Sequence, residues 1–236
     1  MKVVLFDIDG TILWTDGAGR RAVHRALAEV FGAPVHEGHE FDGKTDPQIV
    51  RELMELGGIP APQIAARLPH ALARYVEELH VELGDVGDGG HADKIYPGVH
   101  ALLDALEARD DVLLGLLTGN VREGAMAKLR AVGLEPARFK VGAFGSDHAD
   151  RPELPAIARR RAEEILGSPV SGRDVVVIGD TPADMGCGRG IGARAIGVAT
   201  GRYSVERLQA CQASAVFADL SDTEAVVRAI LGGQDS

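Results

Sequence analysis

The chain has few cysteines, no long apolar run and no sign of a leader. Only Cys187 and Cys211 occur in 236 residues, too few for a disulfide framework. The longest apolar runs fall far short of a membrane span, and only four apolar residues separate Lys2 from Asp7, too few for a signal peptide. The sequence therefore predicts a protein of the reducing cytoplasm that does not enter a membrane.

Basic residues are also scarce. Lysine and arginine total 25 against 35 aspartates and glutamates, which gives a net charge of −10. The overall field therefore repels nucleic acid and anionic membranes, and an anionic substrate would need a local correction to that field. No G-x-x-x-x-G-K-[ST] string is present, so a nucleotide-binding P-loop is not supported. The 45% of hydrophobic residues suffice for one substantial core and a smaller satellite domain.

Strand and helix patterns alternate over most of the chain. The expected elements are, in order, a strand at 3–6, a helix at 99–109, a strand at 112–117, a helix at 121–132, a strand at 140–144, a helix at 153–166, a strand at 175–178, a helix at 182–189 and a strand at 194–198. Such alternation predicts an α/β fold, a Rossmann-like parallel sheet with helices on both faces. Ligands of such sheets bind beyond the carboxyl ends of the strands.

Only helical signals occur between the first strand and this alternating part. Helices are expected at 20–31, from Asp46 to Gly57, and over 62–84, where Pro69 must kink or divide the last one. In the second of these helices, Asp46 and Pro47 are expected to be the N-cap and the first-turn residue. Gly-rich crossings lie on either side of the insert, the second of them a flexible return linker at 84–90. We therefore expect an all-helical cap domain at 17–92 over a catalytic core at 1–16 and 93–236.

Two carboxylates follow the first strand. Asp7 and Asp9 are two residues apart, so the period of a strand turns both toward the same side where the strand ends. Gly10 lets a ligand approach the backbone, and Thr11 supplies a hydroxyl and a backbone donor. The sequence thus places two acids beside one small volume.

Two more strands end in polar side chains. Thr118, Gly119 and Asn120 follow one strand, and we expect Asn120 to cap the next helix and to present backbone amides to an anion. Another strand ends at Asp180, and Pro182 fits the first turn after a Thr181 cap. Asp184 would then lie in that first turn and face the strand end, where it could serve a capping box, the site, or both.

These stretches resemble the motifs of one family. The string Asp7-Ile8-Asp9-Gly10-Thr11 after an apolar strand resembles the first motif of the haloacid dehalogenase superfamily of phosphohydrolases. The stretch 116–120 resembles the second motif, whose Thr or Ser holds phosphoryl oxygens, and 179–184 resembles the fourth, G-D-x-x-x-D. The third motif is usually a lysine, often before a proline, whereas this chain has Arg151 before Pro152. Arginine keeps the charge and adds a bidentate fork suited to phosphate.

The resemblance implies a magnesium site. Its protein ligands would be Asp7, the backbone carbonyl of Asp9, and Asp180, with Asp184 acting directly or through water. Charge arithmetic points the same way, because each pair of like unit charges at 4 Å costs about 4 kcal/mol at an effective dielectric of 20. One arginine does not offset several carboxylates and a phosphate, whereas Mg²⁺ favours such oxygen ligands.

The resemblance is to the phosphoglycolate phosphatase-like branch with a helical cap, and it implies a phosphatase of small phosphorylated metabolites. In such enzymes Asp7 would form an aspartyl-phosphate and Asp9 would act as general acid and base. The other expected site residues are Thr118 and Arg151 as catalytic groups, and Gly10, Thr11, Gly119, Asn120, Lys44 and Arg20 as substrate-binding groups.

Lys44 and Arg20 belong to the insert, which is expected to set specificity. Two alternatives stay open at this point. One is a phosphomutase of the β-phosphoglucomutase type, and the other is a non-catalytic phosphate-binding protein on the same fold.

Overall fold

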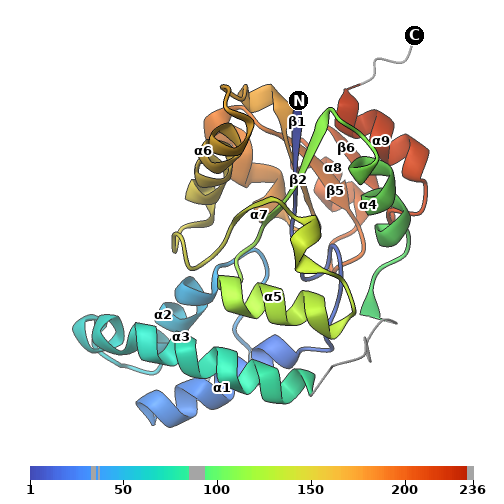
Figure 1. Ribbon diagram of the computed structural model, residues 1–236. Coiled ribbons are helices and arrows are strands. Elements are labelled where there is room, and N and C mark those ends of the chain that lie inside the picture. Colours follow the sequence, from blue (N-terminus) through green and yellow to red (C-terminus); the bar gives the residue numbers. More distant parts are fainter. Residues whose placement is uncertain (33–35, 37, 85–93, 233–236) are drawn as a thin grey trace.

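A parallel sheet forms the centre of the molecule (Figure 1). The structure is a computed structural model that describes residues 1–32, 36, 38–84 and 94–232. Within them the sheet has six strands in the order β3-β2-β1-β4-β5-β6, all parallel. The strands are β1 (Lys2–Phe6), β2 (Val112–Leu117), β3 (Val141–Ala143), β4 (Val175–Gly179), β5 (Arg194–Val198) and β6 (Ala215–Phe217). The five predicted strands are all present, and the predicted fold class is confirmed.

Helices cover both faces of this sheet (Figure 1). The helices are α1 (Ala18–Phe31), α2 (Asp46–Leu56), α3 (Ala61–Leu83), α4 (Val99–Glu107), α5 (Arg122–Ala131), α6 (Leu154–Leu166), α7 (Pro182–Cys187), α8 (Val205–Gln209) and α9 (Thr223–Leu231). Short 3₁₀ turns are η2 (Pro136–Arg138), η3 (Arg151–Glu153), η4 (Gly172–Asp174) and η5 (Gly188–Ile191). None of the helices in the described part of the chain has both the length and the apolarity that a membrane span requires.

Strands β1, β2, β4 and β5 bury both of their faces, which explains their continuous apolar sequences. Because side chains alternate along β1, Val4 and Phe6 pack with α4, α5 and α9 in one apolar cluster. Val3 and Leu5 pack with α6 in another cluster on the opposite face. The two clusters fix the strand register and hold the carboxyl ends of the strands at one edge.

The strand order reverses its direction beside β1. The chain proceeds from β1 to β2 and β3 on one side and then returns to place β4 on the other side of β1. Open α/β sheets bind ligands at such a switch point. Asp7 follows β1 and Asp180 follows β4, so both acids lie there.

The helical insert packs mainly on one helix of the sheet region. Helices α1, α2 and α3 share an apolar cluster with Ala127 and Ala131 of α5 and with Val121, which precedes α5 (Figure 1). The opposite side of α5 packs Ala125 and Leu129 into the cluster beneath the sheet. Helix α5 thus packs against the insert on one side and against the sheet on the other.

Two expectations about the insert have different outcomes. Helix α3 continues through Pro69, so the helix is not divided there, and the other expected outcome, a kink at Pro69, stays a prediction. The predicted linker at 84–90 lies, apart from Gly84, outside the described residues, as does the boundary near 92. The division into a core at 1–16 and 93–236 and a cap at 17–92 stays a prediction.

Candidate active site

The end of β1 is held tightly against the end of β4. Asp7 is buried, and its backbone N–H donates to the carbonyl of Ile178 at 2.9 Å. Gly10 has a φ of 84°, and a side chain there would collide with the carboxylate of Asp180. The buried hydroxyl of Thr11 donates to Asp180 Oδ1 at 3.2 Å. The predicted loop therefore packs its backbone against a carboxylate of another strand.

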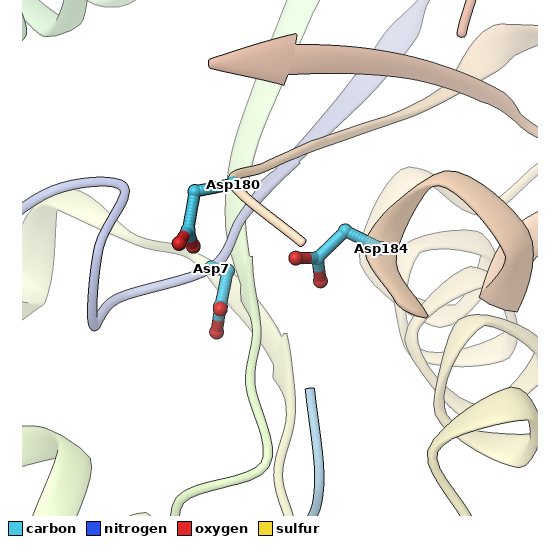
Figure 2. Close-up of side chains that lie close together, drawn as sticks. All are labelled: Asp7, Asp180 and Asp184. Atoms are coloured by element: carbon cyan, nitrogen blue, oxygen red, sulfur yellow. The ribbon is translucent and has the colours of Figure 1, made fainter. Parts of the chain in front are cut away.

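Three carboxylates converge at this point. Asp7, Asp180 and Asp184 each offer an oxygen, these oxygens lie within 4.8 Å of one another, and all three residues are buried. Figure 2 shows Asp184 pointing from its helix toward the other two side chains. The structure thus brings together three of the four residues that the sequence predicts as metal ligands.

Asp184 has two tasks. It completes a capping box, because Thr181 donates to its carboxylate from the backbone N–H at 3.0 Å and from the hydroxyl at 2.6 Å. Its other oxygen accepts from Arg151, whose guanidinium also lies 3.3 Å from Asp7 Oδ2. Arg151 is buried at the start of η3, and its guanidinium lies beside two of the three carboxylates.

The electrostatics of this cluster show an excess of negative charge. Burial raises the pKa of Asp7 to about 6, Arg151 opposes the rise, and Asp184 and Asp9 add to it. Burial and then the charges of Asp184 and Asp7 raise the pKa of Asp180 to about 9. For Arg151, burial opposes the charge, but the carboxylates of Asp184 and Asp7 outweigh it and raise the pKa of the guanidinium. One arginine is therefore too little for three ionised acids.

Asp9 has different neighbours. Its carboxylate accepts from Lys128 Nζ at 2.6 and 2.8 Å and from the amide of Asn120 at 2.8 Å. The same amide donates to Thr118 Oγ1 at 2.8 Å, and Thr118 is fully buried. The Asp9 side chain thus lies outside the three-carboxylate cluster, while Asp9 and Thr118 are linked through Asn120.

The expected cap of helix α5 is wrong. The N-cap position belongs to Val121, which has no side-chain capping bond, because the Asn120 side chain is occupied by Asp9, Thr118 and Lys128. The free N–H of Val121 donates instead to the Asp46 carboxylate of the insert at 2.7 Å. The sequence predicted that the N-terminus of α5 presents its amides to an anionic ligand. In the structure the carboxylate of Asp46 binds there instead.

A loop of the insert, residues 41–46, covers the strand ends. Asp46 donates its N–H to the carbonyl of Gly119 at 2.8 Å, and Thr45 Oγ1 donates to the carbonyl of Ala149 at 2.5 Å. Gly119 has no room for a side chain, since one would collide with the carbonyl of Lys44. The N-cap of α2 is Thr45, whose side chain accepts from Gln48, so the expected Asp46 cap is wrong by one residue.

A cavity of about 570 Å³ lies between this loop and the strand ends. Asp7, Asp9, Thr118, Arg151, Lys44 and Arg20 are among its lining residues. Both predicted specificity residues are thus at the cavity, each with partners in the insert.

Lys44 and Arg20 both have interaction partners within the insert. Lys44 Nζ lies 2.5 Å from Glu52 and 3.3 Å from His39 Nε2. Arg20 stacks 4.0 Å over the ring of Phe41 and donates to the carbonyl of His39 at 2.8 Å. A substrate group would therefore have to compete with these partners or extend them.

The sequence reasoning missed Lys128. A lysine in a helix usually lies on the solvated face, but Lys128 is buried beside the site. The signal was its position on the apolar stripe of α5, one turn from Ala125 and one turn from Ala131, both of which are buried. A cation on such a stripe indicates a buried anion close by.

Comparisons with known proteins show which proteins this chain resembles in sequence and in fold. A phosphoglycolate phosphatase of Rhodospirillum rubrum is 30% identical over 229 residues, which cover 93% of this chain and 88% of that protein. A β-phosphoglucomutase from Clostridium difficile has the same fold, with a TM-score of 0.72, 16% identity and 98% of each chain covered. A hydrolase from Pseudomonas syringae gives a TM-score of 0.69 at 20% identity, covering 98% of this chain and 99% of its own.

The family model of a haloacid dehalogenase-like hydrolase matches residues 1–192, a span that contains all four motifs. The resemblance that the motifs indicated is confirmed, and so is the expectation of an enzyme of this hydrolase class. The chain belongs to the haloacid dehalogenase-like hydrolase family.

Proposed function

We propose that this protein is a Mg²⁺-dependent phosphatase that hydrolyses small phosphate monoesters through an aspartyl-phosphate on Asp7. The observation that carries the proposal is the cluster of Asp7, Asp180 and Asp184, three buried carboxylates within 4.8 Å at the switch point of the sheet. The similarity to a phosphoglycolate phosphatase supports a phosphate ester as the substrate.

The donor set fits magnesium. Three carboxylates provide hard oxygen ligands, and burial together with the neighbouring carboxylates raises the pKa values of Asp7 and Asp180, so a divalent cation would stabilise their ionised forms. Asp7, Asp180, Asp184 and the carbonyl of Asp9 would hold the ion. When bound, the ion would offset the negative charge of the carboxylates and of the phosphoryl group.

Several residues of the chain take part in the two steps of hydrolysis. Asp7 Oδ attacks phosphorus, and the bond to the ester oxygen breaks as Asp9 gives that oxygen a proton. In the second step Asp9 takes a proton from water, which attacks phosphorus, breaks the bond to Asp7 and releases phosphate. Thr118 and Asn120 line the phosphoryl position, and Arg151 attracts its oxygens.

One observation favours an anion beside Arg151. Its Nε is buried and has no hydrogen-bond partner among the described residues, although the side chain lines the cavity. A buried donor without an acceptor is costly, and a phosphoryl oxygen would satisfy it. This supports Arg151 as the residue that fills the place of the usual lysine.

Specificity is proposed to come from the insert. The strand-end residues address the phosphoryl group that every monoester shares, so discrimination requires other contacts. Lys44 and Arg20 line the cavity from the insert and are the proposed contacts to the rest of a phosphorylated metabolite. A phosphomutase is the alternative, because the pair Asp7 and Asp9 would serve the transfer of a phosphoryl group to a sugar equally well.

Hydrolysis of p-nitrophenyl phosphate with and without Mg²⁺ tests the proposal. We expect turnover that depends on Mg²⁺ and stops on addition of a chelator. Binding of inorganic phosphate without any turnover would contradict an enzyme and support the non-catalytic alternative. Conversion of a sugar monophosphate to its isomer in the presence of the sugar bisphosphate, faster than phosphate release, would favour the mutase.

A further inference from the structure

The Asp9 carboxylate lies in a closed triangle of side chains. Lys128 Nζ donates to both Asp9 oxygens at 2.6 and 2.8 Å and to Asn120 Oδ1 at 2.7 Å, and Asn120 Nδ2 donates to Asp9 Oδ2 at 2.8 Å. Lys128 and Asn120 are buried, at 4% and 6% exposure, whereas the Asp9 side chain is 28% exposed to the cavity. Two buried residues therefore orient one partly open carboxyl group.

The insert contributes two further polar side chains near this triangle, those of Asp46 and Tyr75. The buried Asp46 carboxylate attracts Lys128, accepts from the N–H of Val121 at 2.7 Å, and is hydrogen-bonded by the Tyr75 side chain. Tyr75 is 1% exposed on α3 and Asp46 begins α2, so both belong to the helical insert. Lys128 is thus bonded to the carboxylate of Asp9, while the Asp46 carboxylate of the insert acts on it through charge alone.

We propose that Lys128 is a positioning residue that holds the Asp9 carboxyl group toward the leaving oxygen, and that the negative charge of Asp46 in the insert favours this position of Lys128. The inference rests on the proposed phosphatase function, in which Asp9 moves the proton. A general acid must lie within hydrogen-bond reach of the leaving oxygen, about 2.6–3.2 Å. Two donors from Lys128 and one from Asn120 restrict the Asp9 side chain to one orientation, whereas a free aspartate samples several.

This arrangement links the insert to the chemistry. The Asp46 carboxylate lies at the start of α5, the helix that carries Lys128, because the loop 41–46 is bonded to Gly119 and Val121. Docking of the insert therefore completes the surroundings of Asp9 at the same time as it covers the cavity. Misplacement of a catalytic group by about 1 Å can cost ~100-fold in rate, so such a link has a measurable effect.

The first test compares Lys128→Met with Arg130→Met, an exposed cation two residues further along the same helix. Phenyl phosphate and p-nitrophenyl phosphate have similar shapes, but only the phenolate needs much help from an acid. We expect Lys128→Met to lose at least ~10-fold more kcat on phenyl phosphate than on p-nitrophenyl phosphate, with KM within about 2-fold of wild type. Arg130→Met should match wild type on both. Equal losses of Lys128→Met on the two substrates would overturn the proposal.

A structural readout separates this inference from the proposed function. Crystal structures of the wild-type protein and of Lys128→Met should show Asp9 in one orientation in the former and in a different or divided orientation in the latter. An unchanged Asp9 in the variant would overturn the positioning role, whatever the activity of the wild type. Should Lys128→Met fail to fold, Lys128→Gln keeps a donor toward Asp9 and is tested in the same two ways.

The role of the insert has its own variant. Asp46→Asn keeps an oxygen for the N–H of Val121 and removes the negative charge that attracts Lys128. We expect the same preference for the better leaving group, with an extra loss of about 3-fold on phenyl phosphate. An unchanged ratio between the two substrates would show that Lys128 needs no help from the insert.

Discussion

Asp7 and Asp9 are two residues apart in the chain and lie in opposite surroundings. Asp7 is buried among two other carboxylates, with the single guanidinium of Arg151 against them. Asp9 is partly open to the cavity and is bonded by an ammonium and an amide. The first region lacks positive charge and so suits a cation and an anionic ligand, whereas the second is satisfied by the chain itself and so suits a group that must keep its orientation.

The largest effect should come from the first region. Asp7→Asn is expected to lower turnover by at least ~10³-fold, because an amide is neither a nucleophile nor a good magnesium ligand. Circular dichroism and thermal unfolding should show an intact fold. Asp110→Asn, an exposed aspartate after α4, is the matched control and should keep full activity. Wild-type turnover by Asp7→Asn would show that Asp7 is not the nucleophile.

Asp9→Asn tests the second region. The variant is expected to lose ~100-fold or more on esters with poor leaving groups and much less on p-nitrophenyl phosphate, whose leaving group departs without much acid help. Steady-state kinetics on the two substrates measure the difference. Equal losses would mean that Asp9 does not deliver the proton to the leaving oxygen.

The charge deficit around Asp7 also predicts a pH dependence. Burial and neighbouring carboxylates raise the pKa of Asp180 to about 9 and that of Asp7 to about 6, so the folded protein holds protons that the unfolded chain would release. The stability gained from these protons is present below about pH 4 and is lost as the pH rises through 6 and then 9. Magnesium needs the ionised forms and should reverse this loss.

Thermal unfolding with and without saturating Mg²⁺ measures that reversal. The rise in Tm on addition of Mg²⁺ should be larger at about pH 8 than at about pH 5.5, by about 4 °C. Asp180→Asn should abolish the rise at both values. A rise of equal size at both pH values would contradict the assignment of these acids as the metal ligands.

The smallest expected effect is in the insert. Lys44→Ala should lower kcat/KM for the best phosphorylated metabolite several-fold and leave p-nitrophenyl phosphate hydrolysis nearly unchanged. Arg51→Ala removes an exposed cation from the same insert and is the control. A panel of phosphorylated metabolites assayed on both variants provides the measurement. If Lys44→Ala and wild type have parallel profiles, Arg20 becomes the next residue to test.

The first region could be predicted from sequence, whereas in the second the sequence predicted Asp9 and Asn120 as site residues but not Lys128 or the contacts among the three. Asp7 and Asp180 end strands whose apolar runs are unmistakable, and parallel strands bring their carboxyl ends to one edge. Asp184 followed from a capping box that needs only local sequence. The triangle around Asp9 depends instead on a contact between residues 119 positions apart, which no local pattern contains.

The wrong expectations have the same cause. Asn120 was expected to cap α5, but Asp9 and Lys128 are stronger partners for its amide than a helix end. Pro69 was expected to kink or divide a helix, yet α3 is not divided there, because its packing against α1 stabilises it. Tertiary contacts overrode local propensity at each of these positions.

The identity of the nucleophile is the central claim, and its covalent intermediate tests it most directly. The protein is mixed with p-nitrophenyl phosphate and Mg²⁺, quenched in acid, and reduced with borohydride, which converts an acyl phosphate to an alcohol. Peptide mass spectrometry then locates the modified residue. The account predicts reduction of Asp7 to homoserine and no modification of Asp9 or Asp180. Modification at another aspartate, or turnover without any trapped residue, would contradict it.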